Sequence, residues 1–407
     1  MKRKVLLLPA IIVCLATNFS ADAQPLKARI KIDTERVIGN IDTMLYGNFT
    51  EHLGRCIYGG IYDPKSSQAN KDGFRKDVID ATKNMSVSIV RWPGGNFVSG
   101  YHWMDGIGPV ENRPKKKDLA WGDIESNIVG TDEFIKFARA ANTQPYICVN
   151  MGTGSIDEAR NWVEYCNAPA GFYYSDLRGK NGHAEPYKVK YWGLGNEVDG
   201  PWQMGHLNAE DYSKKALEAA KLMKWSDNDI KLIASGSSNY GGGADWQSWN
   251  RTVVNSLFDY IDYISLHHYA GNRDKDHNRF MASMQMVENV IDITRGLIKE
   301  AQQKRRSRRP IYIAFDEYNV WYRAGNEQKL EERYNLQDAL MVAAYLNTFV
   351  RNADIVKMAN LAQLVNVIAP MMVTNDKLWM QTTYYPLMLF AKNCYGQSLQ
   401  SFTDCEK

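Results

Sequence analysis

From about residue 44 onward, short apolar runs alternate with longer amphipathic stretches, and this alternation constrains the fold more than any other feature. Each apolar run is long enough for one buried strand, and stretches such as 209–223, 284–303 and 336–352 repeat apolar residues at helical spacing. Eight such units favour a (β/α)8 TIM barrel over a doubly wound sheet, which usually has fewer strands. The predicted strands are 44–49, 88–92, 145–150, 190–194, 232–235, 263–266, 311–315 and 356–361.

The predicted barrel occupies residues 44–395, and the segments on either side of it differ from it. Residues 1–23 combine a basic start, an apolar stretch and a small-x-small site, which predict a signal peptide cut after Ala23 and a secreted or periplasmic protein. Residues 24–43 include an alternating segment, 27–33, which predicts a half-buried strand. Residues 396–407 are too few to supply a sheet for that strand, so we expect it to lack a partner.

Charge and motifs exclude several classes of function. Residues 1–23 carry three cations and one anion, or +2 of the formal +3, which leaves about +1 after cleavage and gives no electrostatic case for nucleic acid. The basic runs 115–117 and 304–309 are interpreted as solvated surface. No CxxC or HExxH pattern is present, so neither a metal nor a cofactor is expected. No membrane span is expected after signal cleavage, and the odd number of remaining cysteines leaves their disulfide state open.

Two of the predicted strands run directly into a glutamate, at Glu197 and at Glu317. A carboxylate at the end of an apolar strand loses hydration, so two of them invite a joint explanation. The C-terminal ends of barrel strands form the active site, where a carboxylate pair is typical of a glycosidase. Retaining and inverting reactions both remain open at this point, and a structural ion pair is the alternative for each glutamate. Asp316 precedes Glu317, and strand alternation predicts that these two side chains point to opposite sides, which gives Asp316 a structural role.

Carboxylate, amide and aromatic side chains follow the other predicted strands at the same end of the barrel. Such side chains suit a neutral sugar, because they offer hydrogen bonds to hydroxyl groups and flat surfaces for C–H faces. The candidates are Glu51, Asn96, Asn196, Trp202, His267, Tyr269, Trp321 and Gln363. Glu51 could instead pair with Arg55 or Arg91, and His267 could be a core residue or a metal ligand instead of a donor to the nucleophile.

At these residues the chain closely resembles the α-L-arabinofuranosidases of glycoside hydrolase family 51. The matching segments recur in the family's order and span about residues 40–390. They are GNFTEHLGRCIYGGIY (47–62), RWPGGNFVSGY (91–101), KYWGLGNEVDGPWQ (190–203), SLHHY (265–269), FDEYNVW (315–321) and NLAQLVNVIAP (360–370).

The resemblance implies a retaining, exo-acting enzyme that removes α-L-arabinofuranosyl groups from arabinan, arabinoxylan and their oligosaccharides by double displacement. It implies that Glu197 is the acid/base, that Glu317 is the nucleophile, and that Tyr269 orients the nucleophile with His267 close by. The implied ligands of the arabinose hydroxyls are Glu51, Asn96, Asn196 and Gln363.

The resemblance also bears on assembly and on the chain ends. It suggests homo-oligomers, and it implies that 24–43 and 396–407 are remnants of a C-terminal β-sandwich that is largely missing. Two alternatives stay open. One is another retaining barrel glycosidase, such as a β-xylosidase or an endoglucanase, and the other is an inactive carbohydrate-binding fragment.

Overall fold

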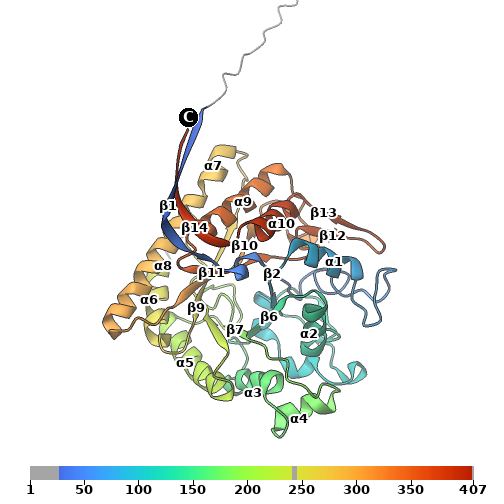
Figure 1. The fold of residues 1–407 in the computed structure, drawn as a ribbon. Helices are drawn as coiled ribbons and strands as arrows, with labels where there is room; N and C mark the ends of the chain where they lie inside the picture. Colours follow the sequence, from blue (N-terminus) through green and yellow to red (C-terminus); the bar gives the residue numbers. More distant parts are fainter. Residues whose placement is uncertain (1–26, 241–244, 406–407) are drawn as a thin grey trace, which may run out of the picture.

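The computed structural model describes residues 27–240 and 245–405, and its central feature is a closed barrel of eight parallel strands (Figure 1). The strands follow one another around the barrel in chain order, so the predicted (β/α)8 fold is confirmed. The predicted signal peptide, 1–23, lies outside the described residues. The barrel strands are β2 (Gly47–Phe49), β3 (Ile89–Trp92), β6 (Gln144–Val149), β7 (Tyr191–Leu194), β8 (Lys231–Ala234), β9 (Tyr263–Ala270), β10 (Tyr312–Val320) and β11 (Val356–Ala362).

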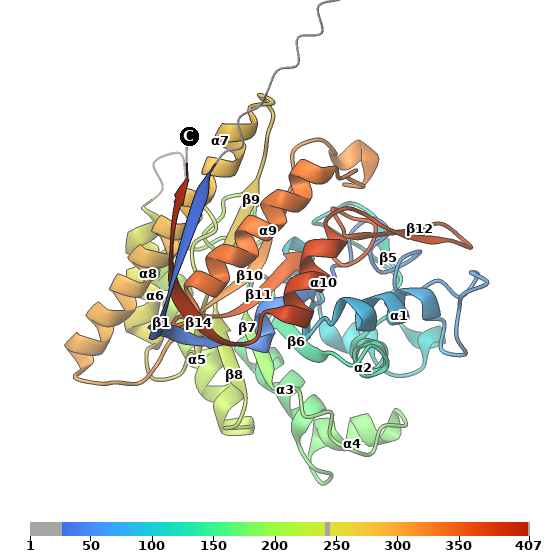
Figure 2. The ribbon, with the colours of Figure 1, turned by 45° about the horizontal axis from the view of Figure 1, so that its top comes forward.

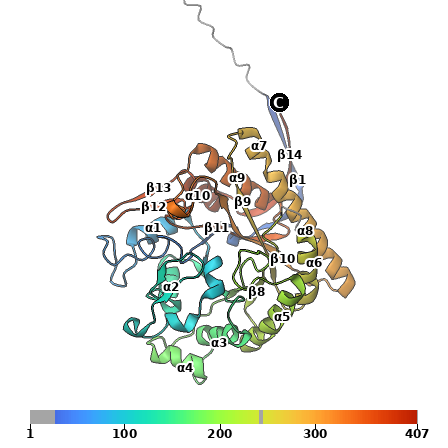
Figure 3. The same ribbon diagram turned by 180° about the vertical axis from the view of Figure 1, so that it is seen from behind.

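Helices surround the barrel and bury their apolar faces against it (Figure 3). In α5, for example, Tyr212, Ala216 and Ala220 recur every four residues and are all buried. No helix in the described part of the chain is long and apolar enough to cross a membrane. The helices are α1 (Lys76–Met85), α2 (Thr131–Ala140), α3 (Ile156–Asn167), α4 (Tyr173–Lys180), α5 (Ala209–Ser226), α6 (Trp246–Leu257), α7 (His277–Ala282), α8 (Met284–Arg305), α9 (Leu336–Arg351) and α10 (Tyr384–Asn393).

The barrel interior is apolar at one end and polar at the other. At the N-terminal ends of the strands, seven of them contribute a buried side chain to one cluster: Ile89, Tyr146, Tyr191, Ile233, Tyr263, Ala314 and Met358. Because side chains alternate along a strand, the next inward position lies two residues further on. In β3, β9 and β10 that position holds Arg91, Ser265 and Asp316, which begin a polar layer near the C-terminal face.

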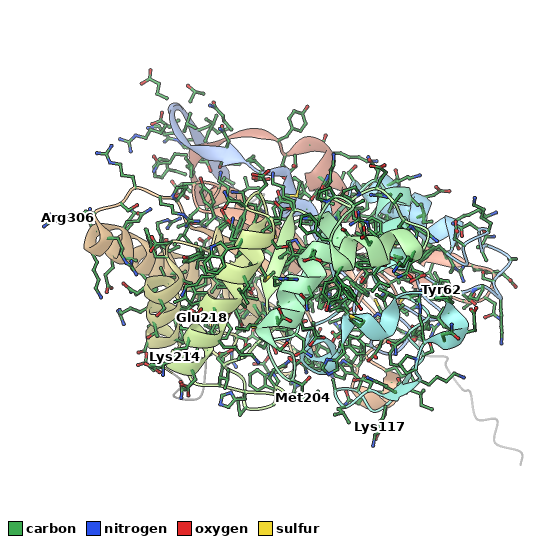
Figure 4. The ribbon with its side chains drawn as sticks, turned by 90° about the horizontal axis from the view of Figure 1, so that it is seen from below. Tyr62, Lys117, Met204, Lys214, Glu218 and Arg306 are labelled. Carbon is green, nitrogen blue, oxygen red and sulfur yellow. The ribbon has the colours of Figure 1, made fainter. Side chains whose placement is uncertain are left out.

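The loops after the strands build this C-terminal face. Two of them contain hairpins, formed by β4 (Lys116–Lys117) with β5 (Ile124–Glu125) and by β12 (Met371–Val373) with β13 (Leu378–Met380). Figure 4 shows Lys117, from the loop after β3, and Met204, from the loop after β7, on the same side of the molecule, away from Arg306 at the end of α8.

The strand before the barrel has a partner, contrary to the prediction. β1 (Ala28–Ile41) pairs antiparallel with β14 (Gly396–Cys405), and the two form a ribbon that projects from the barrel (Figures 1 and 2). The prediction assumed that β1 needs a whole sheet, but one neighbouring strand is sufficient, and the residues after α10 form that strand, β14. The ribbon remains half solvated, since Ile30 and Ile32 are 66% and 60% exposed. The five cysteines of the described residues are free thiols, and Cys148 is buried as predicted.

Candidate active site

The two glutamates meet at the C-terminal face of the barrel. Glu197 follows β7 in a turn with a positive φ of 42°, and Glu317 lies within β10. A carboxylate oxygen of each and a ring nitrogen of His267 lie within 4.8 Å of one another. The Nδ1 atom of His267 is 3.0 Å from Glu197 Oε1 and 3.6 Å from Glu317 Oε2. The imidazole therefore hydrogen-bonds to Glu197 and lies within ion-pair distance of Glu317.

A β-bulge in β10 brings Glu317 into this position. Against β9, Ala314 pairs with Ser265 and Glu317 pairs with His267, so three steps along β10 match two along β9. The extra residue places the consecutive Asp316 and Glu317 both inside the barrel. The prediction that they point to opposite sides is therefore wrong, because strand alternation fails at a bulge. Asp316 is 1% exposed and Glu317 is 7% exposed.

Arg91 joins the polar residues beneath the glutamates. Its guanidinium donates from Nη1 to Glu317 Oε2 (2.8 Å) and from Nη2 to Asn196 Oδ1 (2.6 Å), and its Nε lies 3.7 Å from Asp316 Oδ2. Burial alone would raise the pKa of Asp316, but Arg91 and His267 lower it to about 2. Asp316 is thus a fixed anion that holds two cations below the reacting groups.

His267 is the second cation of this layer. Burial would lower its pKa, but the charge of Glu317 and the hydrogen bonds to Asp316 and Glu197 raise it to about 10. The imidazolium has N–H donors on both nitrogens, and its Nε2 lies 3.1 Å from Ser265 Oγ. His267 therefore supplies positive charge to both glutamates and a hydrogen bond to Glu197.

Glu51 lies in a polar pocket beside Glu317. Its carboxylate accepts hydrogen bonds from Phe97 N, Trp121 Nε1 and Gln363 Nε2, each at 3.0 Å. Burial and the nearby charge of Glu317 nevertheless raise its pKa to about 7. A Cβ atom on Gly95 would lie 2.9 Å from Glu51 Oε2, so the glycine allows the backbone to approach the carboxylate this closely. The alternative pairing of Glu51 with Arg55 or Arg91 is not seen, because Arg55 pairs with Glu331 and Arg91 with Glu317.

The other predicted site residues also lie on this face. Tyr269 donates its hydroxyl to Glu317 Oε1 (2.9 Å), and Trp202 donates Nε1 to Glu197 Oε2 (2.8 Å). Trp321 stacks edge-on to Tyr269 and is 40% exposed. The Asn196 Nδ2 atom is buried and has no hydrogen-bond partner among the described residues, so it is free to donate to a ligand. Asn96 is half-buried at the start of a 3₁₀ turn next to Gly95.

Glu197, His267 and Glu317 are also spaced closely enough to hold a metal ion. The charges around these three residues favour hydrogen bonds among them over a bound metal ion. Arg91 already places a positive charge 2.8 Å from Glu317, and the raised pKa of His267 leaves no free lone pair on its ring at neutral pH.

Several residues that the structure brings to the site were not predicted to belong to it. Arg91 was considered only as a partner of Glu51, although an arginine inside a fully buried strand needs a buried partner and so could have been identified. Trp121 and Tyr240 could not be identified from the sequence, because each lies in a loop whose path depends on tertiary contacts. Trp121 is held by the β4–β5 hairpin, where Glu125 bonds to His52 and Tyr58.

Comparison with known proteins places this geometry among carbohydrate-active enzymes. The family model described as α-L-arabinofuranosidase 1 domain matches residues 81–291. The intracellular exo-α-(1→5)-L-arabinofuranosidase 1 of Bacillus subtilis is 46% identical over 94% of this chain and 78% of that protein. The family 51 α-L-arabinofuranosidase of Bifidobacterium longum has a TM-score of 0.89 at 36% identity, covering 93% of this chain and 79% of that one. The α-L-arabinofuranosidase of Thermotoga maritima, solved with arabinose, has a TM-score of 0.85 at 42% identity, covering 93% and 76%.

The comparisons correct two expectations. Secretion is contradicted, because three bacterial relatives at 44–46% identity are named intracellular arabinofuranosidases. The family model described as α-L-arabinofuranosidase C-terminal domain matches residues 316–407, so that domain is represented here, from within β10 to the end of the chain. The expectation that this domain is largely missing rested on residues 396–407 alone, whereas the matched segment also includes the last barrel strand and α10.

Proposed function

The chain belongs to the α-L-arabinofuranosidases of glycoside hydrolase family 51, and from this membership we propose that Glu317 and Glu197 hydrolyse terminal α-L-arabinofuranosyl groups with retention of configuration. The spacing of the carboxylates carries the proposal. Retaining glycosidases hold their carboxyl groups about 5–5.5 Å apart and inverting ones about 6.5–9.5 Å apart. One oxygen of Glu197 and one of Glu317 lie within 4.8 Å of each other, a close approach that fits the shorter spacing better than the longer one and supports a retaining reaction.

In the first step, a carboxylate oxygen of Glu317 bonds to the anomeric carbon while the bond to the leaving oxygen breaks. Glu197 donates its proton to that oxygen, so the remainder of the substrate departs as an alcohol. Tyr269 and Arg91 each donate to a different oxygen of Glu317 and hold the carboxylate for attack. Burial and the charge of Glu317 raise the pKa of Tyr269 well above its ordinary value, so it remains a hydrogen-bond donor.

In the second step, Glu197 takes a proton from water, and the water oxygen bonds to the anomeric carbon as the ester to Glu317 breaks. The negative charge thus moves from Glu317 to Glu197 in the first step and back in the second, so the net charge of the site is unchanged. His267 lies beside both carboxylates, so its positive charge can stabilise the negative charge on either one. It can do so without leaving its place between Asp316 and Glu197.

The arabinofuranosyl group itself is placed against Glu51, Asn196, Gln363 and Asn96. Glu51 and Gln363 are bonded to each other twice, through Glu51 N to Gln363 Oε1 (2.8 Å) and through Gln363 Nε2 to Glu51 Oε2, and so form a rigid receptor for hydroxyl groups. Several relatives are named exo-α-(1→5)-L-arabinofuranosidases, so α-(1→5)-linked arabino-oligosaccharides are the expected substrates.

The test compares wild-type protein with the Glu317→Gln variant on 4-nitrophenyl α-L-arabinofuranoside, 4-nitrophenyl β-D-xyloside and α-(1→5)-arabinotriose. The wild type is expected to turn over the arabinofuranoside and to release arabinose from the trisaccharide, and the variant to lose both activities. Higher kcat/KM on the xyloside would favour a β-xylosidase, and binding of arabinotriose without turnover above the variant would favour a carbohydrate-binding role.

A further inference from the structure

Two hollows adjoin the catalytic centre and share Tyr269 as a common wall. One, of about 350 Å³, is lined by Glu197, Tyr240, His267 and Met286. The other, of about 550 Å³, is lined by Trp321, Arg273, Phe280 and Ser283. Because they share Tyr269, the two hollows lie next to each other, and we treat them as one groove from Glu197 to residues of α7, which packs against α8 and α9 (Figure 2).

The groove lies on the leaving-group side of the scissile bond. Glu197, which protonates the leaving oxygen, lines it, whereas Glu51, Asn196 and Gln363, which are placed against the arabinofuranosyl group, do not. The part of the substrate that departs must extend from the oxygen that Glu197 protonates. Among the described residues, the groove begins beside Glu197 and can receive that part.

The near end of the groove contains an unused hydrogen-bond donor. The Tyr240 hydroxyl is buried, and its oxygen lies near the backbone N–H of His267, but its own proton donates to no described acceptor, although buried donors are normally paired. Burial raises the pKa of Tyr240 well above its ordinary value, so the phenol keeps its proton. A sugar hydroxyl in this part of the groove would satisfy it.

The far end of the groove carries an uncompensated positive charge. Arg279 pairs with Asp274 at 2.5 Å, whereas Arg273 is exposed and has no partner among the described residues. The charged residues that line this hollow are therefore two arginines and one aspartate. A guanidinium binds a carboxylate through two parallel hydrogen bonds, and Trp321 beside it offers a flat face to a sugar ring.

We propose that this groove is a leaving-group subsite that favours an acidic saccharide, with Tyr240 bonded to a sugar hydroxyl and Arg273 to a uronate carboxylate. The proposal rests on the proposed arabinofuranosidase activity and narrows its substrate class. A neutral leaving group fills the same groove without engaging Arg273, so the charge affects preference among substrates and is not required for turnover.

The test uses two disaccharides that differ only in one carboxylate, α-L-arabinofuranosyl-galactose and α-L-arabinofuranosyl-galacturonic acid with the same linkage. The measured quantity is the ratio of kcat/KM for the acidic substrate to that for the neutral one. The wild type is expected to prefer the acidic substrate by about threefold at low salt, as for a partly exposed ion pair, and the preference should fade at about 0.5 M NaCl. Arg273→Gln is expected to bring the ratio to about one. Arg308→Gln is the matched control, because Arg308 is also exposed but lies between α8 and β10 at the other end of the barrel.

A second variant tests the near end of the groove. Tyr240→Phe is expected to raise KM for both disaccharides while the acidic-to-neutral ratio keeps its wild-type value. A ratio of one in the wild type, or an unchanged ratio in Arg273→Gln, would overturn the preference for acidic groups. An unchanged KM in Tyr240→Phe would overturn the placement of the sugar. Loss of the arabinofuranosidase itself would be recognised separately, as absence of wild-type turnover of 4-nitrophenyl α-L-arabinofuranoside above Glu317→Gln.

Discussion

Replacing Glu51 by glutamine is expected to remove a pH-dependent loss of stability from the folded protein. Glu51 is 3% exposed, and burial, with the charge of Glu317, raises its pKa from 4.5 to about 7. Below pH 4.5 the carboxyl is protonated in both the folded and the unfolded chain, so it adds no pH dependence. Between pH 4.5 and 7 the unfolded chain loses this proton first, and stability falls as the pH rises.

The size of this loss follows from the shift. Each pKa unit corresponds to about 1.4 kcal/mol, so the shift of Glu51 corresponds to about 3 kcal/mol, fully developed above pH 7. Glu51→Gln has no such proton. Its amide would face Gln363 Nε2 and lose one hydrogen bond, but this cost is the same at every pH.

The assay is urea unfolding followed by tryptophan fluorescence at several pH values between 4.5 and 8. The free energy of unfolding of Glu51→Gln, relative to wild type, is expected to rise by about 3 kcal/mol over this range. His268, whose pKa burial lowers to about 4, and His267 titrate equally in both proteins and cancel in the difference. Parallel pH curves for the two proteins would refute the reasoning.

Three further predictions address the hydrogen-bond network and packing of the site. His267→Phe should lower kcat on the aryl arabinofuranoside about 10²–10³-fold, as for loss of one preorganised donor, and His267→Asn should recover part of it; equal losses in both would contradict the role of the N–H. Gly95→Ala should displace Glu51 and raise KM about tenfold, whereas Gly179→Ala, which meets nothing within 4 Å, should not; a wild-type KM in Gly95→Ala would contradict the close packing. Asp316→Asn should lower the free energy of unfolding by about 3 kcal/mol, because it leaves the buried cations without their anion. The exposed Asp259→Asn should lower it by less than about 1 kcal/mol. Similar values for the two variants would show that Asp316 is not essential to the buried charge layer.

The fold was predictable because its signals are local. Each barrel strand is a short buried apolar run, and helices such as α5 and α9 show both the apolar period and a capping residue, Asn208 and Asn335. The positions of Glu197 and Glu317 followed from the same pattern, since both come at the end of such a run.

The features that could not be predicted depend on strand register and on contacts between residues far apart in the sequence. The bulge that turns Asp316 and Glu317 to the same side exists only relative to β9 and β11. The pairing of β1 with β14 joins segments more than 350 residues apart, such as Ala28 with Cys405. The placement of Trp121 on Glu51 depends on a loop fixed by His52 and Tyr58, which no local pattern reveals.

Trapping the covalent intermediate tests the proposed mechanism most directly. Glu197→Ala retains Glu317 but lacks the base for the second step. An aryl arabinofuranoside with a good leaving group should therefore release its phenolate and leave an arabinosyl ester that accumulates on Glu317. Mass spectrometry is expected to show one arabinosyl unit added, carried by the peptide that contains Glu317, and azide should release it as the α-azide. An adduct on another residue, or a β-azide product, would contradict a retaining reaction through Glu317.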